Sequence, residues 1–189
     1  SLQNELSKIK SEPIERFEIS LLAITDPTLR SQFFQELMNG LRGYETDDVT
    51  KVELNRSTDA SEDEDKEETI DTGFVKKAVL NGEGVNSSAI FSQLHEKGYY
   101  IGRIAWSSKP TSGIGDRINV EAFFKDSEKC CDFAYQIKGI NNQKEDGFNV
   151  TIRAATAQEK KHISELIESA AENAYNIIIG SEVNEDEKG

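Results

Sequence analysis

The densest group of side chains that could bind or react is an acidic run at residues 57–71, which reads STDASEDEDKEETID. Clustered carboxylates are the ligands that calcium prefers, and a calcium loop also needs a glycine at its sixth position and a glutamate at its twelfth. A loop that began at Asp59 or at Asp63 would have glutamate instead of glycine at the sixth position. We therefore expect no metal here and interpret the run as a solvated, flexible linker, because like charges this dense repel each other.

The other residue types that often carry catalysis are sparse in this chain. The two histidines, His95 and His162, have no second histidine or cysteine at the spacing of a zinc site. The two cysteines, Cys130 and Cys131, are adjacent, and a disulfide between neighbours strains the intervening peptide. We expect no metal site and no disulfide, with one cysteine buried and the other exposed, and reduced cysteines favour a cytoplasmic location.

Two glycine-containing stretches, SGIGD at residues 112–116 and NGEG at residues 81–84, share only composition with phosphate-binding loops. Such a loop leads from a strand into a helix and is followed by lysine and a hydroxyl residue, and neither stretch has that context. Both are interpreted as turns. No Gly-x-Ser-x-Gly elbow occurs, and nothing singles out one pair among the many acids. We therefore expect no catalytic residues and no cofactor, and an enzyme with an unrecognised carboxylate-based site is a further alternative.

The net charge of −13 is concentrated outside the segments that predict regular structure. The run at residues 57–71 contributes −7 and the tail at residues 181–189 contributes −3, so the rest of the chain carries −3. That remainder is ordinary for a small soluble domain. The acidic extensions would attract a basic partner, whereas the scarcity of basic clusters argues against a nucleic acid.

Residues 1–56 predict a short lead-in followed by a β-α-β unit. The stretch RFEISLLAI at residues 16–24 is apolar on both faces, which is typical of an inner strand. Asp26 at an N-cap position and Pro27 at the first helical position then predict a helix whose apolar residues recur every four positions. VTKVELN at residues 49–55 alternates apolar and charged residues like a half-exposed strand.

Residues 72–180 predict a second module with the order α-β-β-β-β-α. The stretch at residues 72–82 suits a helix or a strand, of which we expect a helix, and residues 86–98 predict a capped helix. Four strand-like segments follow, and three of them alternate apolar and polar residues. Their connections are too short for crossover helices, which predicts an antiparallel meander. Residues 156–179 carry a capping box and an apolar stripe long enough to cross four strands.

The predicted fold class is therefore α+β: a β-α-β unit, an acidic linker, and an antiparallel meander sheet covered on one face by a long C-terminal helix. The expected divisions are the lead-in and first unit, the linker, the α+β domain and the acidic tail, at residues 1–56, 57–71, 72–180 and 181–189. A two-strand unit is marginal alone, so we expect it to pack on the second module or on a partner. No apolar run of transmembrane length and no signal-like start occurs, so we expect neither a membrane span nor a signal peptide.

Protein interaction is the function that this pattern favours. Tyr99, Tyr100, Trp106 and Phe123 are not assigned to one core by the strand pattern, and they form the candidate interaction surface. Phe123 lies on the polar face of its strand, where it is either covered within the chain or part of an exposed patch. We expect a non-enzymatic, cytoplasmic interaction or regulatory module with a protein partner, a basic one being favoured, and a homo-oligomer is compatible. The alternative is a winged-helix-like nucleic-acid-binding regulator that uses residues 74–106, although the charge argues against it.

Overall fold

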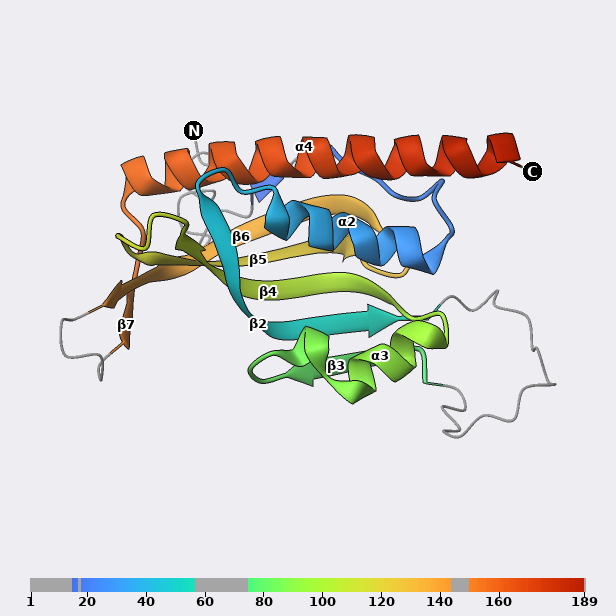
Figure 1. Cartoon of the computed structure of the whole chain (residues 1–189), viewed down its shortest axis with the longest axis horizontal. Helices are drawn as coiled ribbons and strands as arrows, with labels where there is room; N and C mark the ends of the chain where they lie inside the picture. The colour runs from blue at the N-terminus through green and yellow to red at the C-terminus, as the bar shows by residue number, and fades with distance from the viewer. Residues whose placement is uncertain (1–14, 17, 57–74, 144–149, 189) are drawn as a thin grey trace, which may run out of the picture.

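The computed structural model describes residues 15–16, 18–56, 75–143 and 150–188 (Figure 1). These residues form one antiparallel sheet with α-helices packed against it. The elements, in chain order, are β1 (Glu15–Arg16), α2 (Pro27–Asn39), β2 (Tyr44–Asn55), β3 (Lys77–Asn81), the 3₁₀ turn η1 (Val85–Ser87), α3 (Ala89–Glu96), β4 (Tyr100–Pro110), β5 (Arg117–Asp126), β6 (Cys131–Gln143), β7 (Val150–Arg153) and α4 (Ala157–Lys188).

The strands lie in the order β1-β6-β5-β4-β2-β3, and β7 also pairs with β6. Strands β4, β5 and β6 form the meander that the alternating pattern predicts. Strand β2 lies between β4 and β3, so the N-terminal part of the chain contributes a strand to the same sheet. The α+β class with an antiparallel meander and a long C-terminal helix packed on it is confirmed.

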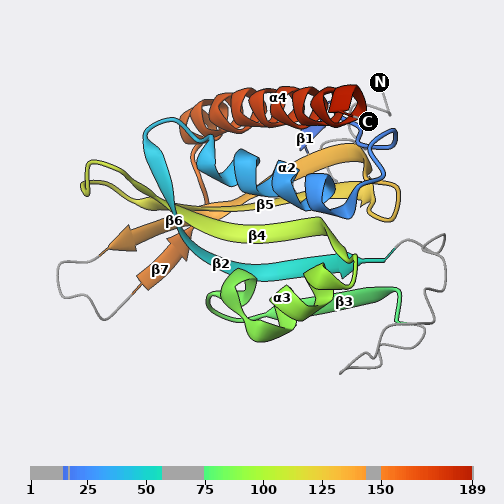
Figure 2. The same cartoon turned by 45° about the vertical axis from the view of Figure 1, so that its right-hand side comes forward.

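Helices α2 and α4 pack on the same face of this sheet, and Figure 2 shows α2 between α4 and the strands β4 and β5. Four phenylalanines form the centre of the contact, with Phe33 and Phe34 on α2 facing Phe124 of β5 at ring-centroid distances of 5.6 Å. Phe133 of β6 lies edge-on to Phe33 at the same distance. The core therefore lies between α2, α4 and one face of the sheet, which leaves the other face without a described helix.

The helix starts follow the signals in the sequence. Asp26 caps α2, because its Oδ1 accepts a hydrogen bond from the backbone N–H of Thr28 at 2.8 Å. Thr156 and Glu159 form the predicted capping box at the start of α4, with reciprocal hydrogen bonds of 3.0 and 3.2 Å. Helix α4 extends to Lys188, so the acidic segment expected as a tail is part of this helix. Among the described residues, no helix combines the length and apolar character needed to cross a membrane.

The segment at residues 16–24 differs from the expected inner strand. Only Glu15–Arg16 pairs with β6, and residues 18–26 have no regular structure. Ile19 and Leu21 are nevertheless buried. The apolar residues of this segment reflect its burial and not the formation of a strand. Its backbone makes only isolated hydrogen bonds to residues near the start of β6.

The prediction of a helix within residues 72–82 is wrong, because the described part of this stretch forms β3. Ala78 pairs with Leu54 and Leu80 pairs with Val52 on β2. A short run with β-branched residues is compatible with either structure, and the long-range pairing with β2 decided it.

Candidate functional site

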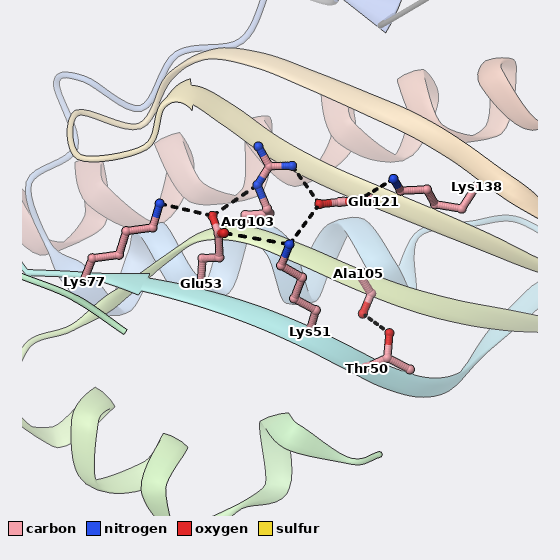
Figure 3. Close-up of polar contacts among 8 residues, drawn as sticks. All are labelled: Thr50, Lys51, Glu53, Lys77, Arg103, Ala105, Glu121 and Lys138. Carbon is pink, nitrogen blue, oxygen red and sulfur yellow. Dashed lines mark hydrogen bonds and ion pairs between the residues drawn. The ribbon is translucent and has the colours of Figure 1, made fainter. Parts of the chain in front are cut away.

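Six charged side chains form an ion-pair network on the face of the sheet opposite α2 and α4, which we call the network face (Figure 3). They come from five adjacent strands, and each of them pairs with at least one residue of another strand. Alternation along β2 turns charged residues to this face while Val52 and Leu54 are buried in the core. The members of the network are Lys51 and Glu53 on β2, Lys77 on β3, Arg103 on β4, Glu121 on β5 and Lys138 on β6.

The strand register explains how these residues meet. Lys51 and Glu121 lie on either side of Ala105 on β4, and the small methyl group leaves space for an ion pair of 3.8 Å across it. Glu53 lies directly opposite Arg103 on β4. Directly opposed and diagonal residues on one face of an antiparallel sheet are within reach of long side chains, so the network follows from the pairing.

Glu121 is the most buried member, with 7% of its side chain exposed. One carboxylate oxygen accepts a hydrogen bond from Nη1 of Arg103 at 2.7 Å, and the other lies 3.1 Å from Nζ of Lys138. Burial is the largest single influence and acts to raise the pKa of this carboxyl, but the hydrogen bonds and charges of Arg103 and Lys138 together lower it below its usual value. Glu121 is therefore held as a carboxylate and is a poor proton donor at neutral pH.

Glu53 forms the second centre of the network. Its Oε2 lies 3.1 Å from Nε of Arg103 and 3.6 Å from Nζ of Lys77, and its Oε1 lies 3.8 Å from Nζ of Lys51. Arg103 therefore bridges both carboxylates, which its planar guanidinium does with separate N–H groups.

The network contains four cations and two carboxylates, and thus an excess of positive charge in a chain of net charge −13. The lysines are the accessible members, because 51% of the Lys77 side chain and 46% of the Lys138 side chain are exposed. Each carboxylate has three cationic partners, whereas an ammonium group carries three donors and about half of each of these two lysine side chains is exposed. The arrangement is suited to bind an anion and not to transfer a proton.

Arg103 also covers Phe123, one of the four aromatic residues expected to form an interaction surface. The guanidinium carbon lies 4.0 Å from the ring centroid, and Phe123 is only 5% exposed. A cation over an aromatic face is favourable and removes part of the ring from water. Phe123 is therefore covered within the chain, and it lies beneath the network.

The other three expected surface residues are buried too, and the structure does not bring the four together. Trp106 is 1% exposed and its indole N–H donates to Oγ of Ser108 at 3.0 Å. Tyr99 and Tyr100 are fully buried, and their hydroxyls donate to backbone carbonyls. The four aromatic residues therefore do not form an exposed surface in this structure. Each ring is packed within the fold, and the polar groups of the tryptophan and the two tyrosines have internal hydrogen-bond partners.

Cys130 does not add a reactive group to the site. Both thiols are free, Cys130 being buried and Cys131 half-buried, so the expectation that one is packed inside is confirmed. Burial raises the pKa of the Cys130 thiol to about 12, and a thiol that stays protonated is a weak nucleophile. Within the described ranges, no three His, Cys, Asp or Glu side chains converge as metal ligands would.

Sequence reasoning missed the network, although one signal was present. Charged residues recur at alternate positions of β2 and on the polar face of β5, next to apolar residues that are buried. The sequence alone does not give the register that places Glu53 opposite Arg103, nor the strand that carries Lys77. Comparison with protein-family models, with curated proteins and with solved structures found no match to this chain.

Proposed function

We propose that this chain is a non-catalytic protein-interaction module whose network face binds an acidic segment of a partner protein. One observation carries the proposal: four cations surround two carboxylates on this face of an otherwise acidic chain. Lys77 and Lys138 lie at opposite ends of the network, on β3 and β6, so a partner segment that crossed the strands would meet both.

The network is organised before a partner arrives. Arg103 is held by both carboxylates and lies over Phe123, so it loses little freedom on binding. A partner carboxylate would replace water at the exposed lysines without separating the pairs beneath them. Each exposed pair contributes only about 0.2–1 kcal/mol, so binding requires several acidic residues in one segment.

An acidic peptide fits this face better than a nucleic acid does. Phosphate contacts supply most of the affinity for DNA and require a row of exposed basic side chains, whereas only Lys77 and Lys138 of the network are about half exposed. The winged-helix interpretation of residues 74–106 also required two helices before a two-stranded wing, and the described residues have β3 in place of the first helix. A basic partner for the acidic segments at residues 57–71 and 181–189 stays a separate prediction, and the first of these segments lies outside the described residues.

The test is fluorescence anisotropy with a labelled octaglutamate peptide at low ionic strength. We expect saturable binding that weakens with salt. The double variant Lys77→Gln/Lys138→Gln removes the two most exposed cations and should weaken binding about threefold to tenfold.

The matched control is Lys160→Gln/Lys161→Gln, which makes the same change of charge at exposed positions on α4, on the other side of the sheet. Binding by this control should stay within about twofold of the original. Equal losses in both variants would mean that only net charge matters, and no binding by the unmodified chain would refute the proposal. Tighter binding of a mixed-sequence DNA duplex than of the peptide would favour the nucleic-acid alternative.

A further inference from the structure

A pocket of about 490 Å³ lies at one end of the network face, where β2 ends and β3 begins. We call it the end pocket. Its lining includes Lys77, which is also a member of the network, so the pocket and the network are continuous (Figure 3). Lys125 lines it from β5, where it alternates with Glu121 and Phe123 and therefore lies on the same face of the sheet.

The end pocket is positively charged, unlike the chain as a whole. The charged residues among its described lining are four cations and two acids, namely Arg56, Lys76, Lys77, Lys125, Asp126 and Glu128. Its lining therefore has a formal charge of +2 in a chain of net charge −13. One of the two carboxylates serves the local turn, because Oδ1 of Asp126 accepts a hydrogen bond from the backbone N–H of Lys129 at 3.1 Å.

This charge fits a phosphate group better than a single carboxylate. A phosphate monoester carries a charge of about −1.5 to −2 near neutral pH and offers three strong acceptor oxygens. Arginine and lysine donate short, charge-assisted hydrogen bonds to such oxygens. One glutamate side chain in the pocket would leave about half of its formal charge without compensation, whereas one phosphate group would compensate nearly all of it.

The backbone that carries two of the cations is held in place by the β2–β3 ladder and by a buried tyrosine. The Arg56 N–H donates to the Lys76 carbonyl at 2.8 Å. The hydroxyl of Tyr99 donates to the carbonyl of Val75, and the Arg56 guanidinium carbon lies over the Tyr99 ring, 5.8 Å from its centroid. Because these donors are positioned before an anion arrives, they lose less conformational freedom on binding.

A glycine on β4 allows the other side of the pocket to approach. A Cβ atom at Gly102 would lie 2.5 Å from Nδ2 of Asn55 and 2.8 Å from Cβ of Ser127, and both of these residues line the pocket. Only glycine therefore lets the end of β2 and the turn after β5 come this close to each other across β4. The close approach brings Lys125 into the same pocket as Arg56.

We propose that the end pocket binds the phosphate group of a phosphoserine within the acidic partner segment. This inference rests on the proposed function of the network face and names the partner more closely. The carboxylates of the segment lie along the network and its phosphate lies in the pocket, with Lys77 between the two. A free phosphate ion would fill the pocket without using the network, and a nucleic acid would need a row of exposed cations that the network does not supply.

The experiment measures the binding of three labelled peptides to the full chain by fluorescence anisotropy at low ionic strength and neutral pH. The peptides are octaglutamate, octaglutamate with phosphoserine in place of its fourth residue, and nonaglutamate, which matches the formal charge of the phosphopeptide. We expect the phosphopeptide to bind about threefold to thirtyfold more tightly than either of the other two.

The variant Lys76→Gln/Lys125→Gln removes two exposed cations of the pocket that are not members of the network. It should abolish the advantage of the phosphopeptide and change the Kd for octaglutamate by less than about twofold. The matched control is Lys160→Gln/Lys161→Gln, which makes the same change of charge at exposed positions on α4 and should keep the advantage.

The inference and the proposed function fail in different ways. If octaglutamate binds but the phosphopeptide binds no more tightly than nonaglutamate, or if its advantage survives in Lys76→Gln/Lys125→Gln, the phosphate site is overturned and the proposed function stands. If only the phosphopeptide binds, and does so through Lys76 and Lys125, the proposed function fails and the phosphate site stands. Tighter binding of inorganic phosphate or of a mixed-sequence DNA duplex than of the phosphopeptide would overturn the inference, because it would assign the pocket to another ligand.

Discussion

At the scale of single residues, Glu121 is the most buried member of the network, and its carboxylate pairs with three cations. The substitution Glu121→Gln keeps the shape and removes the charge, which leaves those cations close together without compensation. We expect a loss of about 1–3 kcal/mol in the free energy of unfolding at pH 7, measured by urea denaturation. The control is Glu45→Gln, at a carboxylate that is 55% exposed and paired with Lys109, where we expect less than about 0.5 kcal/mol.

The pH dependence of this difference follows from the lowered pKa of Glu121. A carboxyl whose pKa is lower in the folded state stabilises the fold above its unfolded pKa, and that contribution is lost as the pH falls through the folded value. The unfolded value is near 4.5 and the folded value lies below it. The difference in stability between the original chain and Glu121→Gln should therefore stay constant from pH 7 down to about 4.5, and it should shrink as the pH falls further, through the folded pKa, in the same urea experiment. A difference that stayed constant with pH would show that the loss comes from packing and not from charge.

At the scale of elements, Arg30 links α2 to the turn between β5 and β6. Its guanidinium donates to the carbonyls of Ile24 at 2.6 Å, Glu128 at 3.1 Å and Lys129 at 3.3 Å, and the side chain is 6% exposed. It also lies over the ring of Tyr100, 4.8 Å from the centroid. One side chain therefore satisfies carbonyls from two segments far apart in the chain.

Replacing Arg30 with Met removes these donors while keeping most of the buried volume. We expect Arg30→Met to lower the free energy of unfolding by about 2–4 kcal/mol, because the carbonyls of Ile24 and Lys129 lose the charged donor that this side chain supplies. Chemical denaturation measures the change. Arg42→Met is the control, at an exposed arginine just after α2, and should change stability by less than about 0.5 kcal/mol. A similar loss in both variants would contradict the structural role of Arg30.

The elements that were predictable are those with strong local signals. The caps of α2 and α4 and the alternation of β5 are properties of a few neighbouring residues, and each was predicted correctly. Strand β3 was not, because its identity depends on pairing with β2, across the acidic run. The network could not be predicted for the same reason, because the pairing of Glu53 with Arg103 joins positions 50 residues apart. The burial of Phe123 depends on this register too, since Arg103 lies directly opposite it.

At the scale of the whole molecule, charge is distributed unevenly along one chain. The run at residues 57–71 carries −7, whereas the network face has an excess of cations. The strands on either side of the run are paired with each other, since Asn55 lies opposite Lys77 and Arg56 N–H donates to the Lys76 carbonyl at 2.8 Å. The two ends of residues 57–71 are thus held together by the β2–β3 ladder. If this run is a linker, its sequence can change without loss of the fold.

Replacing residues 57–71 with an uncharged Gly-Ser sequence of the same length should therefore leave the fold intact. The net charge becomes −6, because the run supplies −7 of the total of −13. We expect an unchanged circular dichroism spectrum and a Tm within a few degrees of the original. We also expect tighter binding of octaglutamate, because the repulsion between the chain and an acidic partner is reduced. A large fall in Tm would show that the acidic residues contribute to the folded state, and unchanged affinity would show that the network face acts through its local charges alone.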